Sequence, residues 1–134
     1  MNPRRARGRR AWREGHFAEW QAALFLMLTG WRILGFRLKS HGVEIDILAL
    51  RQGVVAVVEV KRRRTLDEAF AAVTPMQLQR LRRAGEAVAA QRSDLRGLGV
   101  RIDLFALAPG RWPRHIPDAW PHLLCAVCRP PQLC

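Results

Sequence analysis

The sequence predicts an α/β domain built as a three-layer α/β/α sandwich with a mixed central sheet. Apolar residues recur at helical spacing in two stretches, 14–28 and 75–91. They alternate with period two in others, most clearly in 43–61 and 100–108. A glycine turn joins the two halves of 43–61 directly, so these two strands are expected to be antiparallel. The expected element order is helix, three strands, helix, strand.

The length and the net charge of the chain indicate which class of protein it belongs to. With 134 residues, 49% of them apolar, the chain is expected to form one domain with its own core. The net charge of +12 comes almost wholly from arginine, because Lys39 and Lys61 are the only lysines. This excess favours an anionic partner, with nucleic acid ahead of an acidic membrane surface. Part of the arginine content can equally reflect a GC-rich genome.

Hydropathy gives an expectation about location. The longest apolar run, 22–30, falls far short of the ~20 residues that a membrane span needs, so we expect a cytoplasmic protein without membrane attachment. Whether the chain forms a homodimer is left open.

The two ends of the chain differ from the domain expected over 14–120. Residues 1–13 are rich in arginine and poor in core-forming side chains, which predicts a disordered basic arm. This arm would either lie along phosphates or only keep the chain in solution. Its candidate phosphate contacts are Arg4, Arg5, Arg9 and Arg10. The tail 121–134 holds the three cysteines, which are Cys125, Cys128 and Cys134. Without a second cysteine pair, an ordinary reduced tail is favoured over a zinc site.

The first helix is expected over 14–28 and ends at Thr29-Gly30. Its large apolar side chains fall on one face, as is typical of a helix that packs on a core. They are Phe17, Trp20, Ala23 or Leu24, and Met27 or Leu28. Glu19 lies at the border of this face, where it either approaches the sheet or stays in solvent.

Three strands are expected next, over 31–38, 43–50 and 54–61. If Gln52-Gly53 is a two-residue turn, the register places Asp46 opposite Glu59 and Glu44 opposite Lys61, all on one face. Two directly opposed carboxylates repel each other unless Lys61 or a divalent cation compensates them. The alternative is an ordinary charged network on a solvated face.

The second half of the chain completes the sandwich. Thr65 to Glu68 forms a possible capping box, and a helix is expected over 75–91 with Pro at its first position. A fourth strand is expected over 100–108, and residues 112–120 are expected to cover the sheet edge as irregular structure without a chemical role. The cations expected near the hairpin, as phosphate contacts or as solvated side chains, are Arg62, Arg63, Arg64 and Arg80.

The hairpin residues carry a resemblance. Asp46 followed by Glu59-Val60-Lys61 resembles the PD-(D/E)xK signature of restriction-endonuclease-like nucleases, in its E-x-K form. Over roughly 14–120 the chain is similar to the YraN-like family of small bacterial proteins with that fold and no settled activity. The further matching motifs are Glu19-x-x-Ala22, Gly30-Trp31, Gly42-x-Glu44-Ile45-Asp46 and Arg101-x-Asp103.

The resemblance implies a restriction-endonuclease-like core and a catalytic site. The implied catalytic residues are Glu19, Asp46, Glu59 and Lys61, and the three carboxylates among them would hold Mg²⁺ or Mn²⁺. Two positions depart from the family pattern, because Ala18 replaces the usual glycine and Gln77 stands where a lysine is common. His41, in the turn before the hairpin, is expected to be a bystander.

Three functions follow from these observations. The first is a metal-dependent endonuclease that hydrolyses phosphodiester bonds in DNA, with branched or structured DNA as the substrate suggested by analogy. The second is a nucleic-acid-binding protein that retains the carboxylate cluster but performs no chemistry. The third is a protein-interaction domain whose arginine content is only genomic. Metal-dependent cleavage separates the first from the other two.

Overall fold

The computed structural model describes the backbone of residues 3–119 and the side chains of residues 16–119. Its elements are α1 Pro3–Leu28, β1 Arg32–Ser40, β2 Val43–Arg51, β3 Val54–Arg62, α2 Leu66–Ala71, α3 Pro75–Gln91, β4 Gly99–Leu107 and β5 Arg114–Ile116. The five strands form one sheet in the order β1-β2-β3-β4-β5. Only β3 and β4 are parallel, so the sheet is mixed, as predicted.

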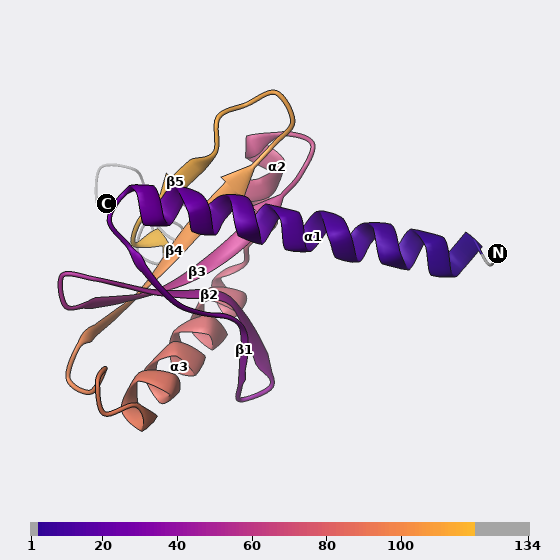
Figure 1. Cartoon of the computed structure of the whole chain (residues 1–134). Coiled ribbons are helices and arrows are strands. Elements are labelled where there is room, and N and C mark those ends of the chain that lie inside the picture. The colour runs from indigo at the N-terminus through magenta and orange to yellow at the C-terminus, as the bar shows by residue number, and fades with distance from the viewer. Residues whose placement is uncertain (1–2, 120–134) are drawn as a thin grey trace.

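Helices cover both faces of this sheet (Figure 1), which confirms the predicted α/β/α sandwich. One apolar cluster joins α3 to the sheet through residues such as Leu78, Leu81 and Val57. The other joins α1 to the opposite face, where Leu26 packs against residues such as Phe105. None of the helices in the described part of the chain is long and apolar enough to cross a membrane.

The face of α1 that packs on the sheet is only partly the one expected, because Ala23 is buried there but the large side chains are not. Its buried residues are Ala18, Ala22, Ala23 and Leu26. The large side chains expected there are mostly exposed, with fractions from 47% to 78%; they are Phe17, Trp20, Leu24, Met27 and Leu28. Small alanines let the helix approach Ala49 and Ala56 on the sheet closely, and bulky side chains would hold it away.

The start of α1 also differs from the prediction. The helix begins at Pro3 rather than at Glu14, so the stretch expected as a disordered arm is helical from Pro3 onward. Alanine and arginine are good helix formers, and proline is tolerated in the first turn. The composition of residues 1–13 correctly indicates that they have too few apolar side chains to form a hydrophobic core. A helix that continues from a packed segment does not need such a core. Figure 1 shows the N-terminal half of α1 reaching beyond the sheet.

Two tight turns fix the register of the first three strands. His41 and Gly42 join β1 to β2, and Gln52 and Gly53 join β2 to β3; all four have positive φ, between 49° and 75°. Positive φ at both central residues defines a type I′ turn, in which glycine is favoured. The predicted two-residue loop is therefore confirmed, with Arg51 paired to Val54.

The crossover from β3 to β4 contains two capped helices. The side chain of Thr65 accepts a hydrogen bond from the Glu68 amide, and that of Thr74 accepts one from the Gln77 amide. The helix predicted over 75–91 is confirmed with the same bounds. Gly85 lets α3 lie directly on the sheet, since a Cβ there would overlap Val57.

The last part of the sheet extends further than predicted. Residues 114–116 form β5, which pairs antiparallel with β4, so the segment expected to be irregular supplies an edge strand. The proposed tail, including its three cysteines, lies outside the described residues.

Candidate active site

The pairing of β2 with β3 ends before either strand does. The ladder runs from Arg51 and Val54 to Ile47 and Val58 and stops there, although both strands continue. Beyond this point Asp46 Oδ2 accepts a hydrogen bond from the Val60 amide at 2.9 Å. The predicted register therefore holds along the ladder, and the side chains of Asp46 and Glu59 interact, although the two residues do not form a backbone pair. Beyond the last backbone pair, the Asp46 side chain therefore accepts the hydrogen bond of the Val60 amide that a backbone carbonyl would accept in a regular ladder.

The neighbouring strand is irregular at the same level. Arg37 has a φ of 49°, in the left-handed region, and no ladder pair joins it to Asp46. Ile45 packs on the α3 side of the sheet, whereas Ile47 packs on the α1 side. Since side chains alternate along a regular strand, residues two apart should share a face. The alternation is therefore broken at Asp46, which lies in the gap between the two cores.

Glu59 is the most enclosed acidic group of the hairpin, with only 5% of the residue exposed. Its Oε1 lies 3.1 Å from Lys61 Nζ and accepts a hydrogen bond from Gln77 Nε2 at 3.1 Å. Lys61 thus compensates the charge of Glu59, one of the two possibilities expected from the sequence, while the ladder ends before Glu44 and Lys61 could pair. Gln77, for which no site role was expected, is part of the site because α3 docks over β3.

Burial raises the pKa of Glu59 to about 7, and the charge of Asp46 adds to this shift while Lys61 opposes it. The pKa of Asp46 is also raised, again through burial first, with the Val60 amide and Lys61 acting against it. A hydrogen bond joins the two carboxyl groups and favours the proton on Glu59. The pair therefore holds a proton more tightly than two separate carboxylates would.

Glu19 is near this pair but is held by a different partner. It forms an ion pair with Arg37, and the charge of Asp46 contributes to raising its pKa, after burial as the main cause. Among the side chains of residues 16–119, no three acidic, histidine or cysteine groups are close enough together to hold a metal ion. The structure thus brings Asp46 and Glu59 together, while Glu19 does not join them as a third ligand.

A groove of about 410 Å³ opens beside Glu59. Its polar lining includes Glu44 from β2 and the first turns of α3 with Thr74, Gln77 and Arg80. Met76, 62% exposed, adds an apolar contact. Glu59 therefore borders this groove through the small part of its surface that is exposed.

The predicted phosphate-binding arginines differ in their partners. Arg62 and Arg63 are exposed, and Arg63 donates to the Arg62 carbonyl. Arg64 is paired with Glu68 at 2.9 Å. Arg80 lines the groove itself. The side chains of the four arginines proposed in the N-terminal arm, Arg4, Arg5, Arg9 and Arg10, lie outside the described range.

A second polar cluster, on β4 and β5, was not anticipated from the sequence. Asp103 is fully buried and accepts hydrogen bonds from Arg101, from the Asp118 amide, and across 2.7 Å from His115 Nε2. Burial raises the pKa of Asp103, but these bonds outweigh it and leave the pKa below its usual value. The cluster ties β5 to the sheet. Its sequence signal was a charged pair, Arg101 and Asp103, inside an apolar strand.

The fold and this site define a small α/β sandwich protein with a buried Asp–Glu–Lys centre beside a groove. A family model described as "Uncharacterised protein family UPF0102" matches residues 18–107. The chain belongs to this family, which confirms the YraN-like membership expected from its motifs.

Relatives from several bacteria match over most of their length. The UPF0102 protein of Caulobacter vibrioides is 57% identical over 117 residues, covering 87% of this chain and 94% of the relative. That of Paramagnetospirillum magneticum is 50% identical over 114 residues, covering 82% and 88%. That of Rhizobium meliloti is 46% identical over 111 residues, covering 83% and 91%. Their names give the family alone, so the activity has to be argued from the site.

Proposed function

We propose that this protein is a metal-dependent endonuclease that hydrolyses phosphodiester bonds in DNA, with branched or structured DNA as its substrate class. The observation that supports the proposal is the carboxyl pair of Asp46 and Glu59 beside Lys61, in which Glu59 also lines a groove. Two neighbouring carboxyl groups whose pKa values are raised by burial are a costly arrangement for structure alone. The arrangement is useful if a cation binds between them and compensates their charges.

The donor set fits Mg²⁺ or Mn²⁺. These hard cations take oxygen ligands and are commonly bound by one or two carboxylates, with water and substrate phosphates completing the shell. Asp46 and Glu59 would be the protein ligands. Glu19 would join them only if it left Arg37. A cation bound there supplies a polarised phosphate oxygen and a bound water of lowered pKa.

The groups around the Asp46–Glu59 pair would each have a different role in the reaction. Lys61, only 17% exposed at its side chain, would stabilise negative charge that develops on the phosphate. Gln77 orients the Glu59 carboxyl by donating to Oε1. The Val60 amide fixes Asp46 in the same way. Both carboxylates are thus held in place before a substrate arrives.

A second function has its own support. Glu59 already has two protein partners, Lys61 and Gln77, and the described residues offer no third ligand for a metal. This favours a nucleic-acid-binding protein in which the carboxyl pair is a structural remnant. Such a protein would bind DNA without metal and would not cleave it.

Thermal melting and cleavage together separate the two functions. Wild type, Asp46→Asn and Lys61→Ala are melted with Mg²⁺, Mn²⁺ or EDTA, and labelled single-stranded, duplex, flap and four-way DNA is tested for cleavage. Because a ligand that binds only the folded state stabilises it, wild type and Lys61→Ala should melt at a higher temperature with metal. Asp46→Asn should lose this shift, and both variants should lose cleavage.

Asp94→Asn is the matched control, since Asp94 is an exposed carboxylate whose partner is Arg92. It should keep both the metal-dependent shift and cleavage. A wild type that shows neither a shift nor cleavage of any substrate would refute the nuclease and leave the binding protein.

A further inference from the structure

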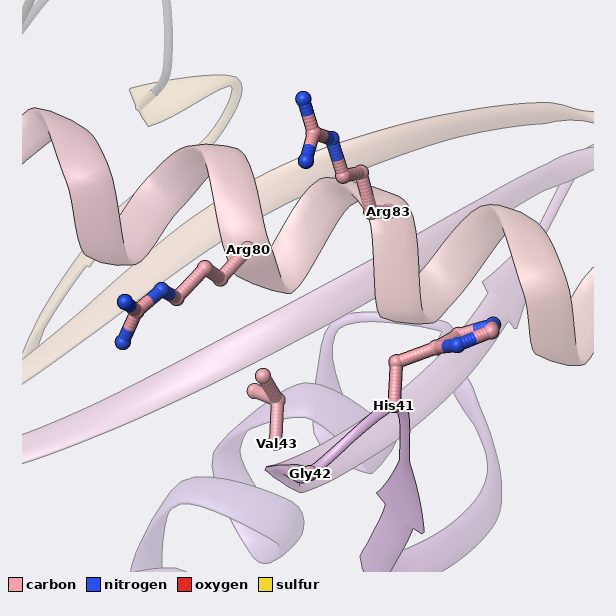
Figure 2. A pocket seen from close by; sticks show the side chains of 5 residues that line it. All are labelled: His41, Gly42, Val43, Arg80 and Arg83. Carbon is pink, nitrogen blue, oxygen red and sulfur yellow. The ribbon is translucent and has the colours of Figure 1, made fainter.

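A second hollow adjoins the groove beside Glu59. It has a volume of about 430 Å³ and is lined by His41, Gly42, Val43, Arg80 and Arg83. Gly42, Val43 and Arg80 also line the groove beside Glu59, so the two hollows adjoin. Figure 2 shows α3 above the β1–β2 turn, with the arginines on the helix and His41 on the turn. We call this hollow the arginine pocket.

The two arginines of the pocket are unlike their neighbours. Both are exposed, and within residues 16–119 neither guanidinium is paired with a carboxylate. Arg82, between them on the same helix, is paired with Glu86 at 3.2 Å. Two unpaired cations at the rim of a hollow favour an anionic ligand.

The directions of the side chains indicate which anion. Arg80 and Arg83 are three residues apart and therefore neighbours on the helix surface. Yet Figure 2 shows their guanidinium groups pointing apart, so they do not converge on a single small ion. A chain of phosphates meets this arrangement better, because each guanidinium can contact a different phosphate, with two parallel hydrogen bonds where the geometry allows.

We propose that the arginine pocket binds the sugar–phosphate backbone of the DNA strand that also passes Glu59. The inference rests on the proposed function for the identity of the strand, and it names where that strand continues. The first hollow is lined by the carboxyl groups of Glu44 and Glu59 as well as by Arg80, whereas the lining of the arginine pocket contains no acidic residue. A polyanion would therefore be attracted at the arginine pocket and would need a cation at the carboxyl pair.

Binding in EDTA tests the pocket without any cleavage. Fluorescence anisotropy of labelled four-way and single-stranded DNA is measured over a range of salt for Arg80→Gln, Arg83→Gln and the double variant. Each phosphate that is no longer neutralised should lower the slope of log affinity against log salt by about 0.9 on duplex or 0.7 on single strands. The double variant should bind about tenfold more weakly or worse at moderate salt.

The control is Arg82→Gln, which removes the same charge from the same helix but from a paired side chain. It should leave the slope nearly unchanged. His41→Asn tests the floor of the pocket while keeping a residue that tolerates the positive φ of 50°. It should weaken binding without lowering the melting temperature.

The outcomes for the pocket and for the nuclease are separate. An unchanged slope in the double variant, or an equal loss in Arg82→Gln, overturns the arginine pocket even if the wild type cleaves DNA. A reduced slope with normal binding by Asp46→Asn supports the pocket, even if no cleavage is found and the nuclease fails.

Discussion

Glu59 is the residue whose protonation should control stability. Its pKa is raised from 4.5 to about 7, first by burial and then by the charge of Asp46, with Lys61 opposing the shift. The folded protein therefore binds this proton more tightly than the unfolded chain does. The resulting stabilisation is full below the unfolded pKa and is lost as the pH rises through about 7.

We expect the free energy of unfolding to rise by about 1 kcal/mol when the pH is lowered from about 8 to about 6. Urea unfolding at several pH values measures this change. Glu59→Gln should lose most of the pH dependence, because it keeps the shape and cannot ionise. Glu68→Gln, which alters an exposed carboxylate paired with Arg64, should keep it. An unaltered pH dependence in Glu59→Gln would place the titrating group elsewhere.

From the sequence we predicted that Asp46, Glu59 and Lys61 lie together, but not how their side chains are arranged. The turn at Gln52-Gly53 brings Asp46 and Glu59 to the same level of the hairpin, and this could be counted from the strand alternation. The broken alternation of side chains at Asp46 could not be counted, because no residue pattern indicates it or the left-handed Arg37 in the adjacent β1. Gln77 reaches Glu59 only after α3 has docked, and no local pattern reports such a contact.

At the scale of elements, the close contact of α3 with the sheet depends on Gly85. A Cβ at this position would overlap Val57 Cγ2 and lie 3.2 Å from Val100 Cγ1. Gly85→Ala would gain about 1 kcal/mol of helix propensity but would overpack the core at a typical cost of about 1 to 3 kcal/mol. We expect a net destabilisation of roughly 1 kcal/mol, measured by urea unfolding.

Ala90→Gly measures the propensity contribution by itself, since Ala90 is exposed on the same helix. If Gly85→Ala stabilises the protein by as much as Ala90→Gly destabilises it, the space between α3 and the sheet is larger than the structure indicates.

The helices and strands marked by their own residue patterns were predicted correctly. The features that depend on contacts with other elements were not. Thr74-Pro75 marks the start of α3, and the confirmed bounds follow from that cap. β5 is only three residues long and has no period of its own, so it forms because the edge of β4 is available. The packing face of α1 was misassigned because large apolar residues dominate a hydrophobic pattern and alanine contributes little to it. Alanine nevertheless allows the helix to lie closest to the sheet.

At the scale of the whole molecule, the N-terminal half of α1 is the feature that extends furthest from the domain (Figure 1). A basic helix in this position would reach phosphates that the groove does not. Deleting residues 1–13 should therefore reduce the salt dependence of DNA binding by about 0.9 in slope for each phosphate that the arm neutralises, while any preference among DNA structures is retained. Salt titrations with the DNA panel measure both quantities.

A full-length variant with glutamine at Arg4, Arg5, Arg9 and Arg10 separates charge from helix length. It should reproduce most of the effect of the deletion. If the deletion leaves the slope unchanged, the N-terminal half of α1 does not contact DNA.

The docking of α3 over the carboxyl pair predicts how pH affects the rates of folding and unfolding. Asp46, Glu59 and Lys61 lie in one hairpin and meet as soon as it forms, while their charges are still in water and interact weakly. Burial, the main cause of the raised pKa values, is complete only when α3 docks with Gln77. The cost of ionising the pair is thus incurred late in folding. Alkaline pH should therefore act mainly by speeding the unfolding of the native protein, with little effect on its refolding rate.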